Sequence, residues 1–246
     1  MNRFKKIKQV IRIFFLISII VVGISFFEKN KLPPQKEILD QLYQDPVQTE
    51  TGMAPFEREV GGITYKITPL YNYELYGLIV SAHSSRSIAD YYHNRYEDFI
   101  NIKDICVVWG ENIRREAYRL SKFKSGPFTC YVKRKGFFDN SSFSNNHLLT
   151  ENKEIAKKIS KAEKGDQVYL KGYLVEYSRK DGFTRRSSTI RTDRGCEVIY
   201  VTGFQILKRT NPYWHITYTT SKYLTVAFLM VLFVIFFVEI GRPVTT

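Results

Sequence analysis

The chain has 246 residues, with 37 Lys and Arg against 24 Asp and Glu, a net charge of +13. Six of the basic residues and one acid lie in the two ends, which leaves residues 28–222 with 31 basic and 23 acidic side chains, a net charge of +8. Anionic lipid, envelope polymers or acidic partners can balance that charge, so it does not require nucleic acid. The three cysteines are 24 and 66 residues apart, which excludes CxxC zinc and redox motifs.

Two apolar runs, Ile11 to Phe27 and Tyr223 to Ile240, are each long enough to cross a bilayer as a helix. The first run has basic residues around its start and no acidic neighbour there, so the positive-inside rule places this end in the cytoplasm. These residues are Arg3, Lys5, Lys6, Lys8 and Arg12. The predicted segments are a basic cytoplasmic tail (1–10), a transmembrane helix (11–27), an extracytoplasmic domain (28–222), a second transmembrane helix (223–240) and a short cytoplasmic tail (241–246).

The expected location is therefore the inner, cytoplasmic membrane, with both termini in the cytoplasm and the main domain in the periplasm or otherwise outside. A cleavable signal peptide is the alternative for the first run, since it also has a basic start and an apolar centre. The small-x-small triplet Gly23–Ile24–Ser25 lies inside the apolar run, with Phe26 and Phe27 directly after it. That position favours an uncleaved anchor.

Between the apolar runs, apolar spacing and turn residues predict short helices and strands. In chain order these are a helix at 35–43, strands at 63–67 and 76–80, a helix at 87–100, a strand at 105–109, a helix at 112–120, a strand at 128–132, a polar loop at 136–146, a helix at 155–162, and strands at 168–177 and 187–207 with a turn at 180–182. This order predicts an α+β domain with a mostly antiparallel sheet and a few short helices. A partly open small barrel would suit its second half.

All three cysteines, Cys106, Cys130 and Cys196, fall in the predicted outer domain, where disulfides persist. We expect one disulfide and one remaining thiol, with any two of the three as the pair. A thiol enzyme needs a thiolate beside an imidazole that a third group orients. His147 with Cys196 or Cys106, and Asp193 or Asn146 as the third group, supplies the residue types. A structural bond from His147 to a neighbouring backbone group explains that histidine equally well.

Basic residues are concentrated in the last third of the domain, interleaved with Tyr177. They are Arg179, Arg185, Arg186, Arg191 and Arg194. Guanidinium groups on a sheet can bind phosphate or carboxylate bidentately, and an aromatic face can stack a sugar or base. An ordinary basic surface near anionic lipid is the alternative interpretation.

Five separated blocks of the sequence occur in an order typical of one family. The blocks are GLIVS (77–81), DICVVWG (104–110), SNNHLL (144–149), GDQVYLKGYLV (165–175) and SSTIRTD with GCEV (187–193 and 195–198). Over most of residues 34–208 the chain resembles a family of uncharacterised bacterial membrane-anchored proteins. The resemblance implies an envelope-exposed domain held by a membrane segment, and it brings no activity, cofactor or catalytic residue. Only two residues separate Asp193 from Cys196, fewer than is usual in that family.

These observations favour a membrane-anchored binding or scaffolding module over an enzyme. Its expected partners are the lipid bilayer and either an anionic envelope polymer or a membrane protein. The alternatives are an envelope hydrolase with a Cys/His pair and an accessory subunit of a transport or secretion assembly. We expect no cofactor and no metal site, because His83, His93 and His147 are scattered without ligand spacing.

Overall fold

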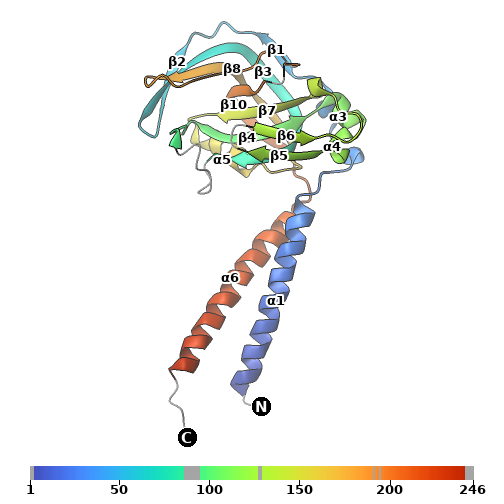
Figure 1. The fold of residues 1–246 in the computed structure, drawn as a ribbon, viewed down its shortest axis with the longest axis vertical. Coiled ribbons are helices and arrows are strands. Elements are labelled where there is room, and N and C mark those ends of the chain that lie inside the picture. The colour runs from blue at the N-terminus through green and yellow to red at the C-terminus, as the bar shows by residue number, and fades with distance from the viewer. Residues whose placement is uncertain (1–2, 86–94, 127–128, 191, 194, 242–246) are drawn as a thin grey trace. The chain divides into compact units, whose positions relative to one another are not determined.

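The computed structural model describes residues 3–85, 95–126, 129–190, 192–193 and 195–241 (Figure 1). The chain forms two compact units. One unit is Leu32–Thr210, and the other combines the two ends, Met1–Lys31 and Asn211–Thr246.

The terminal unit is a pair of long helices, α1 (Arg3–Lys29) and α6 (Pro212–Ile240). Both are long and apolar enough to span a membrane, and they contain the two predicted apolar runs. The helices pack against each other through stacked rings of Phe14 and Phe228, whose centroids are 6.1 Å apart. Polar side chains pair along the same interface: Thr225 Oγ1 donates to Ser18 Oγ at 2.9 Å. This unit is therefore a pair of packed helices from the two ends of the chain, and its outward surface is apolar.

The larger unit is built on five strands whose hydrogen bonds form a closed ring, β3–β4–β7–β10–β8 and back to β3. Their bounds are β3 Ile63–Ser84, β4 Asn101–Val108, β7 Phe143–Leu149, β8 Gln167–Arg179 and β10 Glu197–Lys208. Every neighbouring pair is antiparallel except β7 and β10, which run parallel. The predicted α+β class with a mostly antiparallel sheet is confirmed. The pairing is a closed ring rather than a partly open barrel, and two of its five strands, β3 and β4, come from the first half of the domain.

The length of β3 allows the ring to close. Its 22 residues pair with β8 between Tyr65 and Leu78, and with β4 between Leu78 and Ser84. Alternate apolar side chains of the ring strands are buried together with one face of helix α5 (Lys153–Lys161), which Asn152 caps at its N-terminus. Ring closure therefore buries the strand faces that the alternating pattern marks as apolar.

The other elements lie around this ring. They are β1 (Val47–Glu50) and β2 (Phe56–Val60), which pair with β3; β9 (Thr184–Arg186), which pairs with β8; the short helices α3 (Gly110–Arg114) and α4 (Ala117–Leu120); and the 3₁₀ helices η1 (Gln35–Glu37), η2 (Asp40–Tyr43) and η3 (Asn140–Ser142). A separate two-stranded sheet consists of β5 (Lys122–Gly126) and β6 (Thr129–Lys133). The disulfide Cys106–Cys130 joins β6 to β4.

Several predicted elements differ from the observed ones. The helix predicted at 35–43 is two 3₁₀ turns, and the two strands predicted at 63–80 are one continuous strand. The polar loop predicted to reach residue 146 ends before β7, because Ser144, Asn145 and Asn146 are buried in the ring, where pairing with β4 overrides their low strand propensity. The strand predicted from residue 187 begins only at Glu197. The helix predicted at 87–100 falls mostly on residues outside the described part of the chain.

Gly172 tests the ring closure, since it lies on β8 between β3 and β10. A Cβ at this position would be 2.0 Å from the carbonyl oxygen of Tyr200, a backbone atom that cannot move aside without disturbing β10. We expect Gly172→Ala to lower the free energy of unfolding by about 1–3 kcal/mol, the usual cost of overpacking. Urea unfolding of the full chain in detergent measures this. Gly52→Ala is the matched control, because a Cβ there meets no atom within 4 Å; equal midpoints for the two variants would contradict the pairing.

Candidate functional site

A buried polar pair lies where β4 and β7 face each other. Asp104 is the Cα partner of His147 across this antiparallel pair. Asp104 Oδ1 lies 2.7 Å from His147 Nδ1, and the two side chains are 0% and 2% exposed. The same oxygen accepts a second bond from Asn101 Nδ2 at 2.9 Å. Asp104 is therefore held in place from two sides, and it fixes the orientation of the imidazole ring.

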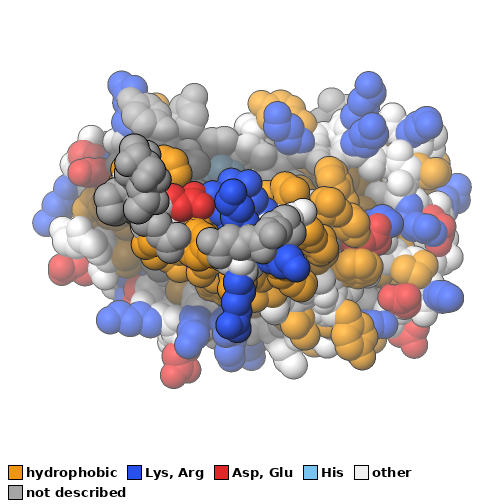
Figure 2. Space-filling view, turned by 90° about the horizontal axis from the view of Figure 1, so that it is seen from below, with side chains coloured by type: hydrophobic (Ala, Val, Ile, Leu, Met, Phe, Trp, Pro, Cys, Tyr) orange, Lys and Arg blue, Asp and Glu red, His pale blue; other side chains and the backbone are white. Residues whose placement is uncertain are grey.

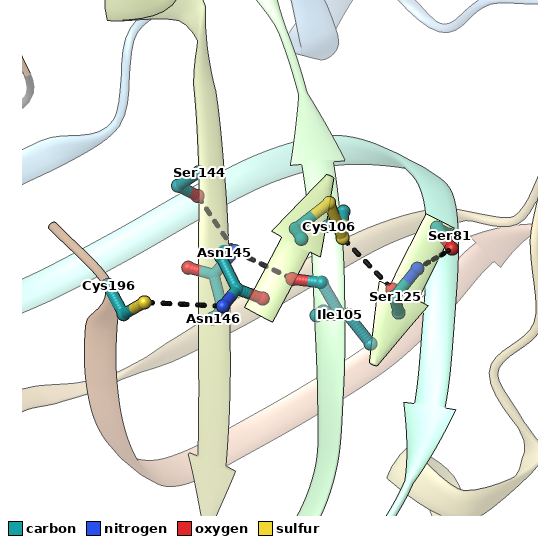
Figure 3. The surroundings of a disulfide bond; sticks show 9 residues. Ser81, Ile105, Cys106, Ser125, Ser144, Asn145, Asn146 and Cys196 are labelled. Atoms are coloured by element: carbon teal, nitrogen blue, oxygen red, sulfur yellow. Dashed lines mark hydrogen bonds between the residues drawn. A yellow bond between two sulfur atoms is a disulfide. The ribbon is translucent and has the colours of Figure 1, made fainter. Parts of the chain in front are cut away.

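Cys196 reaches the same place from the next strand. Its successor, Glu197, begins β10 opposite Asn146 of β7, so Cys196 lies level with Asn145. Asn145 Nδ2 donates to Cys196 Sγ at 3.3 Å, and His147 lies close enough to Cys196 to lower the pKa of its thiol. Because His147 uses Nδ1 for Asp104, its Nε2 is the nitrogen left for the sulfur. Figure 3 shows Asn145 between Cys196 on one side and the disulfide on the other. We call Asp104, His147 and Cys196 the thiol triad.

The triad partners change one another's pKa. Burial alone would raise the pKa of the Cys196 thiol, but the hydrogen bond and positive charge of His147, with the bond from Asn145, lower it overall. Burial would lower the pKa of His147, yet the charge and hydrogen bond of Asp104 outweigh burial and raise it to about 9. These contacts therefore favour the charged forms of both groups, the imidazolium of His147 and the thiolate of Cys196, relative to an ordinary histidine and cysteine.

A cavity of about 320 Å³ opens beside Cys196. It is lined on one side by Asn145, Cys196 and their strand neighbours and on the other by β6. The lining residues are Thr129, Cys130, Tyr131, Val132, Arg134, Asn140, Phe143, Ser144, Asn145, Gly195, Cys196 and Glu197. Cys196 is partly exposed and forms part of the cavity wall.

The disulfide positions the β6 wall of the cavity. A two-stranded hairpin is marginal on its own, so β5 and β6 need attachments to the ring. One attachment is the Cys106–Cys130 bond to β4. Another is the Ser125 amide, which donates to Ser81 Oγ of β3 at 2.9 Å. Two of the three cysteines thus hold the wall, and the third lies in the cavity.

The structure brings together two of the three catalytic candidates from the sequence, His147 and Cys196. The third candidate, Asp193, instead accepts bonds from Ser188 Oγ and the Gly195 amide. Asp104 occupies the third position, which the sequence analysis missed. No spacing motif marks it, since only the strand register places it opposite His147. Asn146, also considered, donates to Ser144 Oγ and to the Ile105 carbonyl on neighbouring backbone.

Of the predicted ligand-binding residues that the structure describes, Arg185 lies beside the triad. Its positive charge lowers the pKa of both His147 and Cys196. Arg186 forms an ion pair with Glu176 at 2.7 Å. The guanidinium of Arg179 binds Asp181 and the carbonyl of Glu97, and this side chain is only 8% exposed.

Tyr177 is fully buried and donates to Asp98 at 2.8 Å, so its ring does not face a surface ligand. Arg191 and Arg194 lie outside the described residues. On the face in Figure 2, Lys and Arg side chains around the rim are interspersed with Asp and Glu side chains.

Within the described residues, no group of three His, Cys, Asp or Glu side chains has the geometry to hold a metal ion. No protein-family model matches the chain, and no curated protein matches its sequence. The site is therefore interpreted from its own geometry.

Alkylation by iodoacetamide tests the coupling within the triad. Because the pKa of Cys196 is lowered, its reactivity should persist to lower pH than that of an ordinary thiol, and fall as pH drops through that lowered pKa. Asp104→Asn removes the charge that raises the pKa of His147, so the imidazolium is lost and the midpoint of Cys196 alkylation should rise by about one unit or more. Peptide mass spectrometry of pH-dependent labelling measures both. Asp193→Asn, which does not contact His147, should leave the midpoint unchanged; an equal shift in both variants would refute the coupling.

Proposed function

We propose that the domain is a membrane-anchored thiol hydrolase or acyl transferase that acts outside the cytoplasm, with Cys196 as nucleophile. The observation that carries this proposal is the buried contact between Asp104 and His147, with Cys196 next to the histidine and on the wall of an open cavity. A nucleophile, a base and a group that orients the base are the parts that covalent acyl transfer requires.

The proposed reaction uses each member of the triad in turn. The Cys196 thiolate attacks the carbonyl carbon of an ester, thioester or amide, and the His147 imidazolium gives its proton to the departing alcohol, thiol or amine. The acyl group remains on sulfur as a thioester. Neutral His147 then takes a proton from water, or from an acceptor amine or alcohol, which attacks the thioester and restores the thiolate–imidazolium pair. Asp104 stays ionised and stabilises the imidazolium throughout.

Asn145 is the candidate for stabilising the negative charge that develops on the attacked oxygen. Its Nδ2 lies 3.3 Å from the sulfur, so a carbonyl bonded to that sulfur would have its oxygen within reach of the same donor. Arg185 adds positive charge nearby. Both groups are fixed on ring strands or on β9, which pairs with the ring.

The sequence patterns favour a binding or scaffolding module, and that remains a prediction. The site supports the Cys/His alternative more strongly, since Arg179 and Arg186 are already paired with Asp181 and Glu176 within the domain. The accessory-subunit alternative and the family resemblance also remain proposals.

We also propose the location. Two membrane-length helices and a disulfide are consistent with a membrane-anchored extracytoplasmic domain. The basic residues before the first apolar run support an inner-membrane topology with both termini in the cytoplasm. The bilayer is then the constant partner of the chain, and substrates would come from the envelope.

Turnover of p-nitrophenyl acetate by the full chain in detergent tests the activity. We expect release of p-nitrophenol with acetylation of Cys196, detected by peptide mass spectrometry. Cys196→Ser should abolish this acetylation, and His147→Ala should slow it by about 10²–10⁴-fold, the usual contribution of a general base. Asp193→Asn is the matched control and should retain the rate. Release that is independent of Cys196 in variants with unchanged melting curves would contradict the proposed nucleophile.

Labelling of introduced cysteines tests the topology. In a Cys196→Ala background, a membrane-impermeant maleimide should label Gly52→Cys in intact spheroplasts of an expressing bacterium, whereas Lys6→Cys and Gly241→Cys should react only after permeabilisation. Immediate labelling at position 241 would contradict a second span. An epitope tag fused to the N-terminus should stay on the chain, and its loss would indicate cleavage of the first span.

A further inference from the structure

One wall of the cavity is the outer edge of strand β6, the edge that faces away from β5. Among the described strands, β6 pairs only with β5, so its other edge has no strand partner. The Ser125 amide of β5 donates to Ser81 Oγ and therefore points away from β6. In an antiparallel pair, residues that face the partner alternate with residues that face away. Ser125 is opposite Cys130, so the main-chain groups of Cys130 point outward, and those of Val132, two residues on, do the same.

This edge faces the nucleophile across the cavity. Cys130, Tyr131 and Val132 line one wall, and Asn145 and Cys196 line another. Backbone N–H and C=O groups on an edge strand bind an added strand through main-chain hydrogen bonds. The cavity thus combines a template for an extended backbone with a sulfur that can attack a carbonyl.

We propose that the substrate is an extended peptide segment that adds as a strand to the outer edge of β6 and presents one of its carbonyls to Cys196. This inference rests on the proposed thiol chemistry and assigns its substrate class. The Cys196 sulfur forms the thioester, the peptide C–N bond breaks, and the leaving amine takes the proton from His147. Main-chain bonds to Cys130 and Val132 fix the register of the segment, so the attacked carbonyl is set by the strand and not by one side chain.

The charge of the cavity selects further among peptides. Among the described residues, two charged side chains line the cavity, Arg134 and Glu197. Burial raises the pKa of Glu197 to about 8, so this side chain is mainly neutral at pH 7. Arg134 directly follows β6. Its guanidinium donates a hydrogen bond to Asn140 Oδ1 at 2.6 Å and lies over the ring of Phe138. A carboxylate on the bound segment therefore complements the cavity, and a cationic side chain does not.

Chloromethyl ketone probes test this binding mode on the full chain in detergent. The probes are acetyl-Ala-Glu-Ala-Ala chloromethyl ketone, its counterpart with methylated main-chain nitrogens, and a third with Lys in place of Glu. We expect the unmethylated Glu probe to label Cys196 at least tenfold faster than the methylated probe, and faster than the Lys probe. Methylation removes the donors that a strand needs and leaves the electrophile unchanged.

Two variants at one position separate strand addition from folding and from thiol reactivity. Val132→Pro removes an outward N–H at an edge, where proline is tolerated, and Val132→Ala keeps the N–H while trimming the side chain. We expect the proline variant to lose the rate advantage of the Glu probe and the alanine variant to keep it, with iodoacetamide labelling of Cys196 equal in both. Equal rates for the methylated and unmethylated probes would overturn the peptide assignment alone. Iodoacetamide labelling no faster than that of an ordinary thiol would instead overturn the proposed nucleophile.

Discussion

The parallel pairing of β7 with β10 is the constraint on which the rest of the structure depends. It closes the strand ring, because β10 then pairs with β8 and β8 returns to β3. It also brings Cys196, at the start of β10, level with Asn145 and beside His147 of β7. The antiparallel pairing of β7 with β4 adds Asp104 on the other side of the histidine. The same hydrogen bonds that build the core thus assemble the thiol triad on neighbouring strands.

Burial of Asp104 and His147 means that their charges must be stabilised by neighbouring groups. Asp104 is 0% exposed, and an isolated buried carboxylate would be costly, so its bonds from His147 and Asn101 are needed for stability as well as for orientation. In a low-dielectric interior the charge of Asp104 raises the pKa of His147 more than it would in water. The disulfide holds the β5–β6 hairpin, and β6 of this hairpin forms one wall of the cavity. The contacts of Asp104 with His147 and Asn101 therefore serve both the stability of the sheet and the proposed chemistry.

The sequence was sufficient for features that depend on local pattern. The two apolar helices, α5 and the strand pair after Gly165 follow from spacing, charge and turn residues. His147 and Cys196 were identified as residue types. Asp104 was not, because nothing local distinguishes it from other acids, and only the register between β4 and β7 places it beside His147. The polar run before His147 was interpreted as a loop for the same reason: Asn145 and Asn146 have low strand propensity, and long-range pairing overrides it. Which cysteines pair was likewise decided by the position of the β5–β6 hairpin.

The titration of His147 tests the central claim most directly, because the thiolate–imidazolium pair depends on this one ring. Nitrogen NMR of the full chain with labelled histidine in detergent, assigned with His147→Gln, reports the protonation of both ring nitrogens. We predict that the pKa of His147 is about 9 and that Asp104→Asn lowers this pKa. A ring that is neutral at pH 7 and unaffected by Asp104→Asn would contradict it, and would leave the histidine as a structural residue of the sheet.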